Sequence, residues 1–330
     1  MPLSVVPVSA VLLEVRNLCV DFGALAALKD VSLDVKAGET LGLVGESGSG
    51  KSTLARAILR LIPAARGTVM WCGLDLLSCD AGIMRRQRRD LQIIFQDPLA
   101  SLNPRMTVGE TLAEPLKIFE PSLAKSERRA RIDDMLERVG LTRSMAPRYP
   151  HEFSGGQCQR IGIARAMMLR PKLLICDEPV SSLDVSIQGQ IVNLLLDLQR
   201  EFGTAMLFIS HNLAVVRHLS HRVLVIYMGK VVEVAARDAL FADPIHPYTR
   251  ALLAAVADPT RSLAGTFIAS GEAMVVGEGL PAGDHRAPGC IYRNRCAYAE
   301  PACARSAPEL EQAAPEHAVA CHRWRALVYS

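Results

Sequence analysis

The chain has 330 residues, half of them apolar, and a formal net charge of +3. This length allows one large domain with an appendage, or two ordinary domains. Charges or glycines interrupt every apolar run before it reaches the roughly 18 residues that a membrane-spanning helix needs. Acidic and basic residues are mixed along the whole chain, which argues against the basic stripe of a nucleic-acid binder. We therefore predict neither a membrane span nor a nucleic-acid partner.

The first part of the chain has the pattern of short strands. Residues 1–10 lack a basic leader and contain prolines, so we expect a short tail and not a secretory signal. From Val11 to Gly73, short apolar alternations are separated by Gly, Asp and Asn, which predicts strands and turns. One helix is predicted within this region, at Lys51–Leu61.

The rest of the chain changes character twice. Residues 107–148 have apolar residues at helical spacing on a charged background, which predicts a helical insert; these are Ile132, Met135, Leu136 and Val139. After it, the compact runs KLLICDE, TAMLFIS and HRVLVIYMG alternate with helical stretches, as buried parallel strands do in a three-layer α/β fold. A shift in composition near residues 240–260 predicts an appended tail.

The segment GESGSGKST is the strongest chemical signal. It follows the apolar run TLGLV and precedes a helical pattern. Glycines allow close backbone approach to a phosphate chain, a helix N-terminus supplies N–H donors, and a lysine and a serine can neutralise phosphate and hold Mg²⁺. A glycine-rich turn is the alternative interpretation. The predicted nucleotide-binding residues here are Gly45, Ser47, Gly48, Ser49, Gly50, Lys51, Ser52 and Thr53.

A second acidic element ends the apolar run LLICDEP. Asp177 stands where a carboxylate that organises Mg²⁺ belongs, and Glu178 is placed to orient or deprotonate an attacking water. Two adjacent acids can also be a solvated strand end. The phosphate-loop pattern upstream favours the functional interpretation.

The segment FSGGQCQR, Phe153–Arg160, resembles the signature motif of ATP-binding-cassette (ABC) ATPases. Further motifs of that family follow the expected order: an adenine-stacking aromatic at Phe22, the Q-loop at Gln96, the D-loop ending at Asp184 and the switch histidine at His211. The resemblance covers about residues 12–260. It implies that Glu178, His211 and Gln96 are catalytic, and that Mg²⁺ is bound through Ser52, Gln96 and Asp177.

The signature residues also have a physical interpretation. Ser154, Gly155, Gly156 and Gln157 open a helical stretch, so hydroxyl, backbone N–H groups and helix dipole form a second anion cradle. In the family this cradle contacts the ATP of a partner subunit. The resemblance thus implies an α/β, P-loop NTPase (RecA-like) domain at residues 11–240, with an antiparallel β subdomain, a helical subdomain at about 97–160, and a small C-terminal extension at 241–330.

Three further segments resemble the ATPase subunits of oligopeptide and dipeptide importers: FQDPLASLNPRMTVGETLAEPL, PVSSLDVSIQGQI and HPYTRALL. This resemblance implies a location on the cytoplasmic face of the cell membrane. It also implies two permease subunits, a second cassette subunit, with a heterodimer favoured over a homodimer, and an extracytoplasmic peptide-binding protein. Alternatives are the ATPase of a nickel or glutathione importer, and a soluble ABC ATPase without a transport role.

The cysteines are concentrated at the C-terminal end. Four of the nine, Cys290, Cys296, Cys303 and Cys321, lie in the last forty or so residues. In the cytosol thiols stay reduced, which favours a metal over disulfides. The resemblance favours a 4Fe–4S cluster, with Zn²⁺ and four buried thiols as alternatives. Cys19, Cys72 and Cys176 lie in apolar runs, so we expect them to pack in the core.

Overall fold

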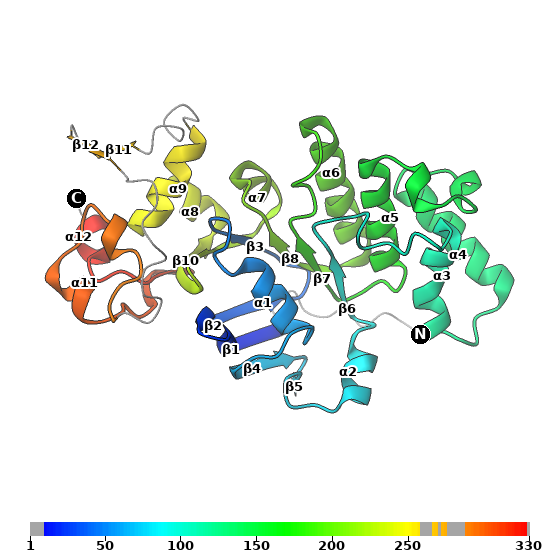
Figure 1. The fold of residues 1–330 in the computed structure, drawn as a ribbon, viewed down its shortest axis with the longest axis horizontal. Helices are drawn as coiled ribbons and strands as arrows, with labels where there is room; N and C mark the ends of the chain where they lie inside the picture. Colours follow the sequence, from blue (N-terminus) through cyan, green and yellow to red (C-terminus); the bar gives the residue numbers. More distant parts are fainter. Residues whose placement is uncertain (1–9, 258–265, 270–271, 276–287, 329–330) are drawn as a thin grey trace. The chain divides into compact units, whose positions relative to one another are not determined.

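The computed structural model of the chain describes residues 10–257, 266–269, 272–275 and 288–328 (Figure 1). They form two compact units. Among the described residues, the first comprises residues 10–13, Asp34–Thr40 and Met70–Ser210, and the second comprises Glu14–Leu33, Leu41–Val69 and the described residues from His211 onwards. Strands that contribute residues to both units are β1 (Val11–Phe22), β2 (Leu25–Lys36), β3 (Thr40–Val44) and β4 (Arg66–Trp71).

The first unit contains parallel strands in the order β8-β7-β6. These are β6 (Leu91–Ile94), β7 (Leu173–Asp177) and β8 (Ala205–Ile209). Every residue of β7 and β8 is buried, which confirms the predicted buried parallel strands. The same unit contains α2 (Ala81–Gln87), α6 (Val185–Phe202) and β5 (Leu74–Asp75), which pairs with β4 in a separate sheet of the order β2-β1-β4-β5.

The predicted helical insert is present in the same unit. Figure 1 shows α3 (Val108–Phe119), α4 (Lys125–Arg138) and α5 (Gly155–Met167) packed beside one another, with short 3₁₀ turns at Arg143–Met145 and Pro150–Glu152. The positions predicted from helical spacing are buried in this packing: Ile132, Met135, Leu136 and Val139.

The second unit is built on a sheet with the order β13-β14-β10-β9-β3. Strand β9 (Arg222–Tyr227) runs parallel to β3 and forms a hairpin with β10 (Lys230–Ala236) across Met228 and Gly229. Both turn residues have positive φ, 44° and 80°, as a two-residue hairpin turn requires. The C-terminal strands β14 (His317–Val319) and β13 (Glu311–Ala314) continue the sheet from β10.

Helices and short strands complete the second unit. They are α1 (Lys51–Ile58), α7 (Leu213–Leu219), α8 (Arg237–Ala242), α9 (Pro247–Ala257), β11 (Thr266–Ala269), β12 (Glu272–Val275), α11 (Pro301–Arg305) and α12 (Trp324–Val328). A single 3₁₀ turn, Arg293–Arg295, lies within the cysteine segment, which we define as residues 288–306. The predicted domain boundary near residue 240 stays a prediction.

Two local expectations were wrong. Helix α1 ends at Ile58 and not at Leu61, because Arg60 takes a left-handed φ of 55° and the N–H groups of Arg60 and Leu61 bond back to Ala57 and Arg56. This is the Schellman arrangement that terminates helices. Cys72 is exposed, not in the core, because it forms the tight turn between β4 and β5 with a φ of 47°.

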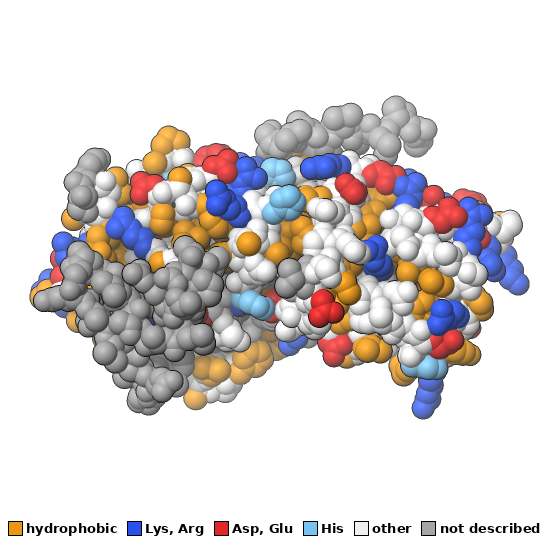
Figure 2. All heavy atoms as spheres, turned by 90° about the horizontal axis from the view of Figure 1, so that it is seen from above, with side chains coloured by type: hydrophobic (Ala, Val, Ile, Leu, Met, Phe, Trp, Pro, Cys, Tyr) orange, Lys and Arg blue, Asp and Glu red, His pale blue; other side chains and the backbone are white. Residues whose placement is uncertain are grey.

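The surface agrees with the charge pattern of the sequence. On the face that Figure 2 shows, Lys and Arg side chains are interspersed with Asp and Glu side chains, and no basic stripe gathers there. Among the residues that the structure describes, no helix is both long and apolar enough to cross a membrane.

Candidate nucleotide-binding site

The predicted phosphate loop lies in the second unit, between β3 and α1. Gly50 caps the N-terminus of α1 with a φ of 102°, and a Cβ there would lie 2.8 Å from the carbonyl oxygen of Ala27. Only glycine fits this combination of conformation and close approach. The loop therefore delivers the chain to the helix N-terminus, where N–H groups and the helix dipole favour a bound phosphate.

Two side chains of the loop indicate how it would receive a phosphate. Lys51 is 4% exposed, and its Nζ donates to the carbonyl oxygens of Gly45 and Glu46, each at 2.9 Å. The hydroxyl of Ser49 is buried and has no hydrogen-bond partner among the described residues. Buried polar groups are normally paired. An orphaned hydroxyl beside a lysine in a glycine-rich loop therefore fits a phosphate oxygen.

The acidic pair lies in the first unit, at the end of β7. Asp177 is the last residue of that strand and is 1% exposed. Glu178 follows with a φ of 48°, a left-handed conformation that is uncommon for a residue with a side chain. Its backbone N–H donates to Ile209 at 3.0 Å, and Gln96 Nε2 donates to its carboxylate at 3.5 Å. The structure thus brings Gln96 and Glu178 together, and their catalytic role stays a prediction.

The signature motif forms the start of α5 in the first unit. Ser154 Oγ accepts from the N–H of Gln157 at 3.3 Å, and Gln157 Oε1 accepts from the N–H of Ser154 at 3.0 Å, a reciprocal capping box. Ser154 and Gly155 are exposed, while Gly156 is buried. A Cβ on Gly156 would lie 2.8 Å from Ile187 of α6, so close packing of α5 on α6 requires glycine there.

Three predicted residues lie at the ends of elements. Phe22 ends β1 and is 51% exposed, so its ring has a free face for stacking. Asp184 is the N-cap of α6, and His211 is exposed just before α7. Sequence analysis missed Asn212, whose side chain caps α7 by accepting from Ala214 and Val215. An Asn just before a helical pattern is a known cap signal.

Sequence analysis also missed the partners of Glu46 in the phosphate loop. Its backbone N–H donates to Tyr248 Oη at 2.9 Å, and its carboxylate accepts from both terminal nitrogens of Arg295 at 3.0 Å. Burial alone would lower the pKa of Arg295, but its hydrogen bonds to Glu46 and Tyr227 outweigh burial and raise that pKa. Tyr248 and Arg295 belong to the C-terminal extension, so this extension reaches the phosphate loop.

The cysteine segment contains three of the four clustered thiols, and Cys321 follows it. Burial raises the pKa of Cys290, of Cys296 and of Cys321, the last to about 11, and the neighbouring thiols add to each increase. The thiols therefore lie close enough to influence one another. Among the described residues, however, no group of three or more His, Cys, Asp or Glu side chains is placed to hold a metal ion. The predicted iron–sulfur and zinc sites are not supported by a ligand geometry.

Comparison with known proteins places these motifs in a family. The family model described as ABC transporter matches residues 28–181, and the one for the C-terminal region of oligopeptide/dipeptide transporters matches residues 232–303. The oligopeptide transport ATP-binding protein OppF of Salmonella typhimurium is 51% identical over 324 residues, which cover 94% of this chain and 96% of OppF. This chain belongs to the ABC transporter ATPases, in the oligopeptide/dipeptide group.

Other relatives of this ABC ATPase agree. A putative peptide import ATP-binding protein of Brucella ovis is 49% identical over 316 residues, 94% of this chain and 98% of that protein. A solved dimeric structure of the cassette MJ0796 with ADP and Pi is 30% identical, covers 68% of this chain and 98% of its own, and has a TM-score of 0.63. The structure of cbiO1 from Clostridium perfringens is 26% identical and has a TM-score of 0.64. The match covers 71% of this chain and 92% of cbiO1. ATP and Mg²⁺ are thus the cofactors expected of this ABC ATPase.

Proposed function

We propose that this ABC ATPase powers the import of oligopeptides or dipeptides through a separate membrane permease. The observation that carries the proposal is the match along nearly the whole chain to oligopeptide transport ATP-binding proteins, together with the match of residues 232–303 to the C-terminal region of that group. A nickel or glutathione importer remains the alternative within the group, because the transported substrate is selected by other subunits. A soluble ATPase without transport is the other alternative.

In the proposed hydrolysis, each site residue has a defined task. Lys51, Ser49 and the N–H groups of the phosphate loop bind the phosphates, while Ser52, Gln96 and Asp177 hold Mg²⁺. Glu178 accepts the proton of the water that attacks the γ-phosphorus, and the bond to the bridging oxygen of ADP breaks. The hydrogen bond from Gln96 to Glu178 supports this assignment, because it joins a Mg²⁺ ligand to the base. Phe22 stacks on adenine, and His211 contacts the γ-phosphate.

The signature residues would serve a second cassette. We infer that Ser154, Gly155, Gly156 and Gln157 contact ATP held by a partner subunit, preferably a related cassette in a heterodimer, with Asp184 beside the interface. The dimeric state of the MJ0796 cassette supports a dimer of cassettes. ATP would bind the closed dimer better than the open one, and release of products would let it open, which drives two permease subunits from the cytoplasmic face.

We further propose that Cys290, Cys296, Cys303 and Cys321 bind a metal, with 4Fe–4S favoured over Zn²⁺. The proposal rests on the number of thiols and on their mutual effect on pKa, not on a ligand geometry. Because the pKa values of Cys290, Cys296 and Cys321 are raised, binding would release protons and weaken at lower pH. The metal proposal can be tested by anaerobic purification of the chain and of a Cys290→Ser, Cys303→Ser variant, followed by iron, zinc and sulfide analysis. We expect the variant to lose the metal. A metal-free wild-type chain would contradict the proposal.

Reconstitution tests the main proposal. The chain would be co-purified with its two permease subunits and partner cassette, and placed in vesicles with the peptide-binding protein and labelled peptide. We expect ATP-dependent peptide accumulation that disappears with Lys51→Ala. Accumulation of Ni²⁺ or glutathione in its place would select the alternative importer. ATP hydrolysis without any associated permease would favour the soluble ATPase.

A further inference from the structure

Glu46 is the point where the C-terminal extension contacts the phosphate loop. Its side chain and its backbone are both engaged by residues some two hundred positions away: Tyr248 Oη accepts from the backbone N–H, and Arg295 donates two hydrogen bonds to the carboxylate. Bidentate Arg–carboxylate pairs fix geometry as well as supply attraction. These contacts therefore restrain one residue of the loop in both position and orientation.

The two restraining side chains are themselves held in place. Tyr248 is 1% exposed, and its ring lies 4.6 Å from that of Tyr227 and 5.5 Å from that of Tyr292, centroid to centroid. The guanidinium of Arg295 lies 5.8 Å from the ring centroids of both Tyr227 and Tyr292, and its Nη1 also donates to Tyr227 Oη at 3.4 Å. Arg295 thus approaches Glu46 from a packed aromatic cluster, which we call the tyrosine cluster (Tyr227, Tyr248 and Tyr292).

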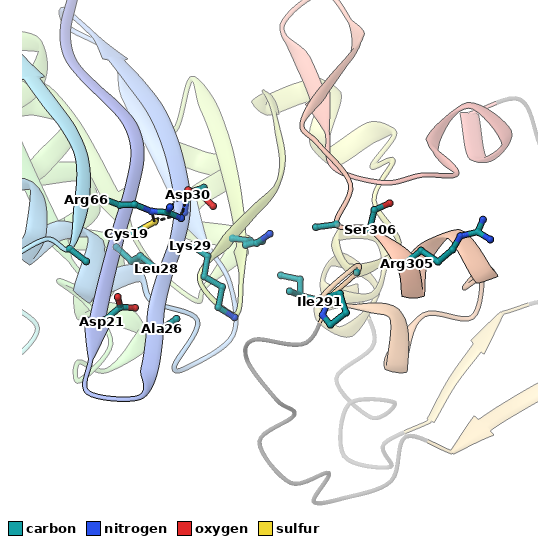
Figure 3. A pocket seen from close by; sticks show the side chains of 15 residues that line it. Cys19, Asp21, Ala26, Leu28, Lys29, Asp30, Arg66, Ile291, Arg305 and Ser306 are labelled. Atoms are coloured by element: carbon teal, nitrogen blue, oxygen red, sulfur yellow. Dashed lines mark hydrogen bonds and ion pairs between the residues drawn. The ribbon is translucent and has the colours of Figure 1, made fainter.

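A cavity lies between part of the cysteine segment and the β1–β2 hairpin. Figure 3 shows Ile291 of this segment on the side of the cavity opposite the β1–β2 hairpin, and the cavity has a volume of about 730 Å³. Lys29 and Lys230 also line this cavity. Burial lowers the pKa of Lys29, and the positive charge of Lys230 lowers it further. Asp21 and Asp30 line it as well, so the cavity carries charges of both signs. The bonds from Arg295 to Glu46, supported by the tyrosine cluster, are the direct hydrogen-bonded link that we describe between the cysteine segment and the phosphate loop.

We propose that Arg295 and Tyr248 are positioning residues of the ATP site, which act through Glu46 to hold the phosphate loop ready for nucleotide. The inference rests on the proposed use of this loop for ATP. A glycine-rich loop loses much conformational freedom when it binds phosphate. A loop that is already restrained loses less on binding, so affinity rises. Because Arg295 directly precedes Cys296, a rearrangement of the cysteine segment would change nucleotide affinity, and nucleotide would stabilise the segment in return.

A double-mutant cycle on the full-length chain tests the proposal. The dissociation constant of Mg-ATP would be measured by calorimetric titration for wild type, Arg295→Met, Glu46→Gln and the double variant. We expect Arg295→Met to weaken binding about threefold to tenfold, a range typical of one lost charge-assisted hydrogen-bonded pair. In the Glu46→Gln background the same substitution should have a clearly smaller effect, because the amide lacks the negative charge and offers Arg295 one acceptor oxygen in place of two.

Controls separate positioning from a general loss of structure. Arg305→Met removes an arginine of the same segment that has no ion pair among the described residues, and it should leave Mg-ATP affinity unchanged. Tyr248→Phe removes only the hydroxyl and should weaken binding without lowering the melting temperature by more than a few degrees. In the assembled transporter, Arg295→Met should raise KM for ATP and leave kcat within about twofold, because the chemical step does not involve the link.

Several outcomes would overturn the proposal. Unchanged affinity in both Arg295→Met and Tyr248→Phe would show that the loop needs no restraint. An equal loss from Arg295→Met in the wild-type and Glu46→Gln backgrounds would show that Arg295 acts on nucleotide independently of Glu46. If Arg295→Met does not fold, Arg295→Lys enters the same cycle, since it keeps the charge and loses the bidentate geometry. A folded wild-type chain that does not bind Mg-ATP would instead contradict the proposed function.

Discussion

At the residue scale, Glu178 is the side chain that we propose as the general base of hydrolysis. Its left-handed φ of 48° and its bond from Gln96 hold the carboxylate at the end of β7. Such strained positions are common at active sites. We expect Glu178→Gln to reduce ATP hydrolysis about 10²- to 10⁴-fold, as loss of a general base does, while Mg-ATP affinity stays within about threefold. Phosphate release and calorimetric titration measure the two quantities.

A matched control for this variant is Glu127→Gln on α4, an exposed glutamate that pairs with Arg131. It should leave both hydrolysis and affinity unchanged. Equal hydrolysis by Glu178→Gln and wild type would exclude Glu178 as the base.

The sequence allows single site residues to be predicted where chemistry and local spacing coincide. The loop from Gly45 to Thr53 carries its own signal, because glycines, lysine and serine are all needed within a few positions. Glu46 has no such signal in the local sequence, since its partner Arg295 lies 249 residues away and no local pattern connects the two residues. Such contacts depend on the tertiary fold.

At the element scale, the start of α9 is a pH-sensitive cap. His246 is 2% exposed, and its Nδ1 accepts from the N–H of Tyr248 at 3.0 Å, so the neutral ring caps the helix. Burial lowers the pKa of His246 to about 4, although Glu233 acts in the opposite direction. Tyr292 packs against the ring. Between about pH 6.5 and pH 4 the unfolded chain binds a proton that the folded chain excludes, so stability falls as pH falls.

His246→Asn tests this cap. Asparagine keeps an acceptor for the N–H of Tyr248 but does not titrate in this range. From pH 7.5 to pH 5, we expect the wild type to lose about 2 kcal/mol of unfolding free energy more than the variant loses, about 1.4 kcal/mol per pH unit below 6.5. Urea unfolding at the two pH values measures the difference. Parallel losses in both proteins would assign the pH dependence to other groups.

The start of α5 allows the signature role to be separated from folding. A Cβ on Gly155 meets only Leu183, at 3.8 Å, whereas one on Gly156 would clash with Ile187. Aspartate at a helix N-terminus is compatible with the helix dipole, but it repels a phosphate. We expect Gly155→Asp to keep its melting temperature and Mg-ATP affinity, and to lose at least about tenfold in hydrolysis by the assembled transporter. Full hydrolysis in this variant would contradict a phosphate contact from α5.

Elements with a long repeat were predictable, and short ones were not. The helical spacing from Ile132 to Val139 and the apolar runs of β7, β8 and β9 each predicted the observed element. Strands β13 and β14 were missed, because three or four residues with mixed polarity carry no periodic signal. They become strands by pairing with an existing sheet edge.

At the scale of the molecule, the C-terminal strands β13 and β14 are a structural part of the second unit. Strand β14 pairs with β10 through Glu233, Val234 and Ala235, and the N–H of Ala320 donates to Val232. An uncovered β10 would present unpaired backbone groups to other chains. The composition shift near residue 240 predicted an extension but not this pairing, because composition does not report which sheet edge a strand joins.

The buried carboxyl group of Glu233 makes this attachment specific. It is 0% exposed and accepts from the backbone N–H groups of Ile245 and His246, while its Oε1 lies 2.7 Å from Nε2 of His317 on β14. Strand, helix start and extension thus meet at one side chain.

Loss of the imidazole leaves a buried acceptor with fewer partners, so His317→Ala should lower the unfolding free energy by about 2–3 kcal/mol. His322→Ala, in the same extension but bonded only to the carbonyl oxygen of Ser306, should change it by less than about 0.5 kcal/mol. Urea unfolding of both variants decides the point, and equal effects would mean that Glu233 does not fasten β14 to the sheet.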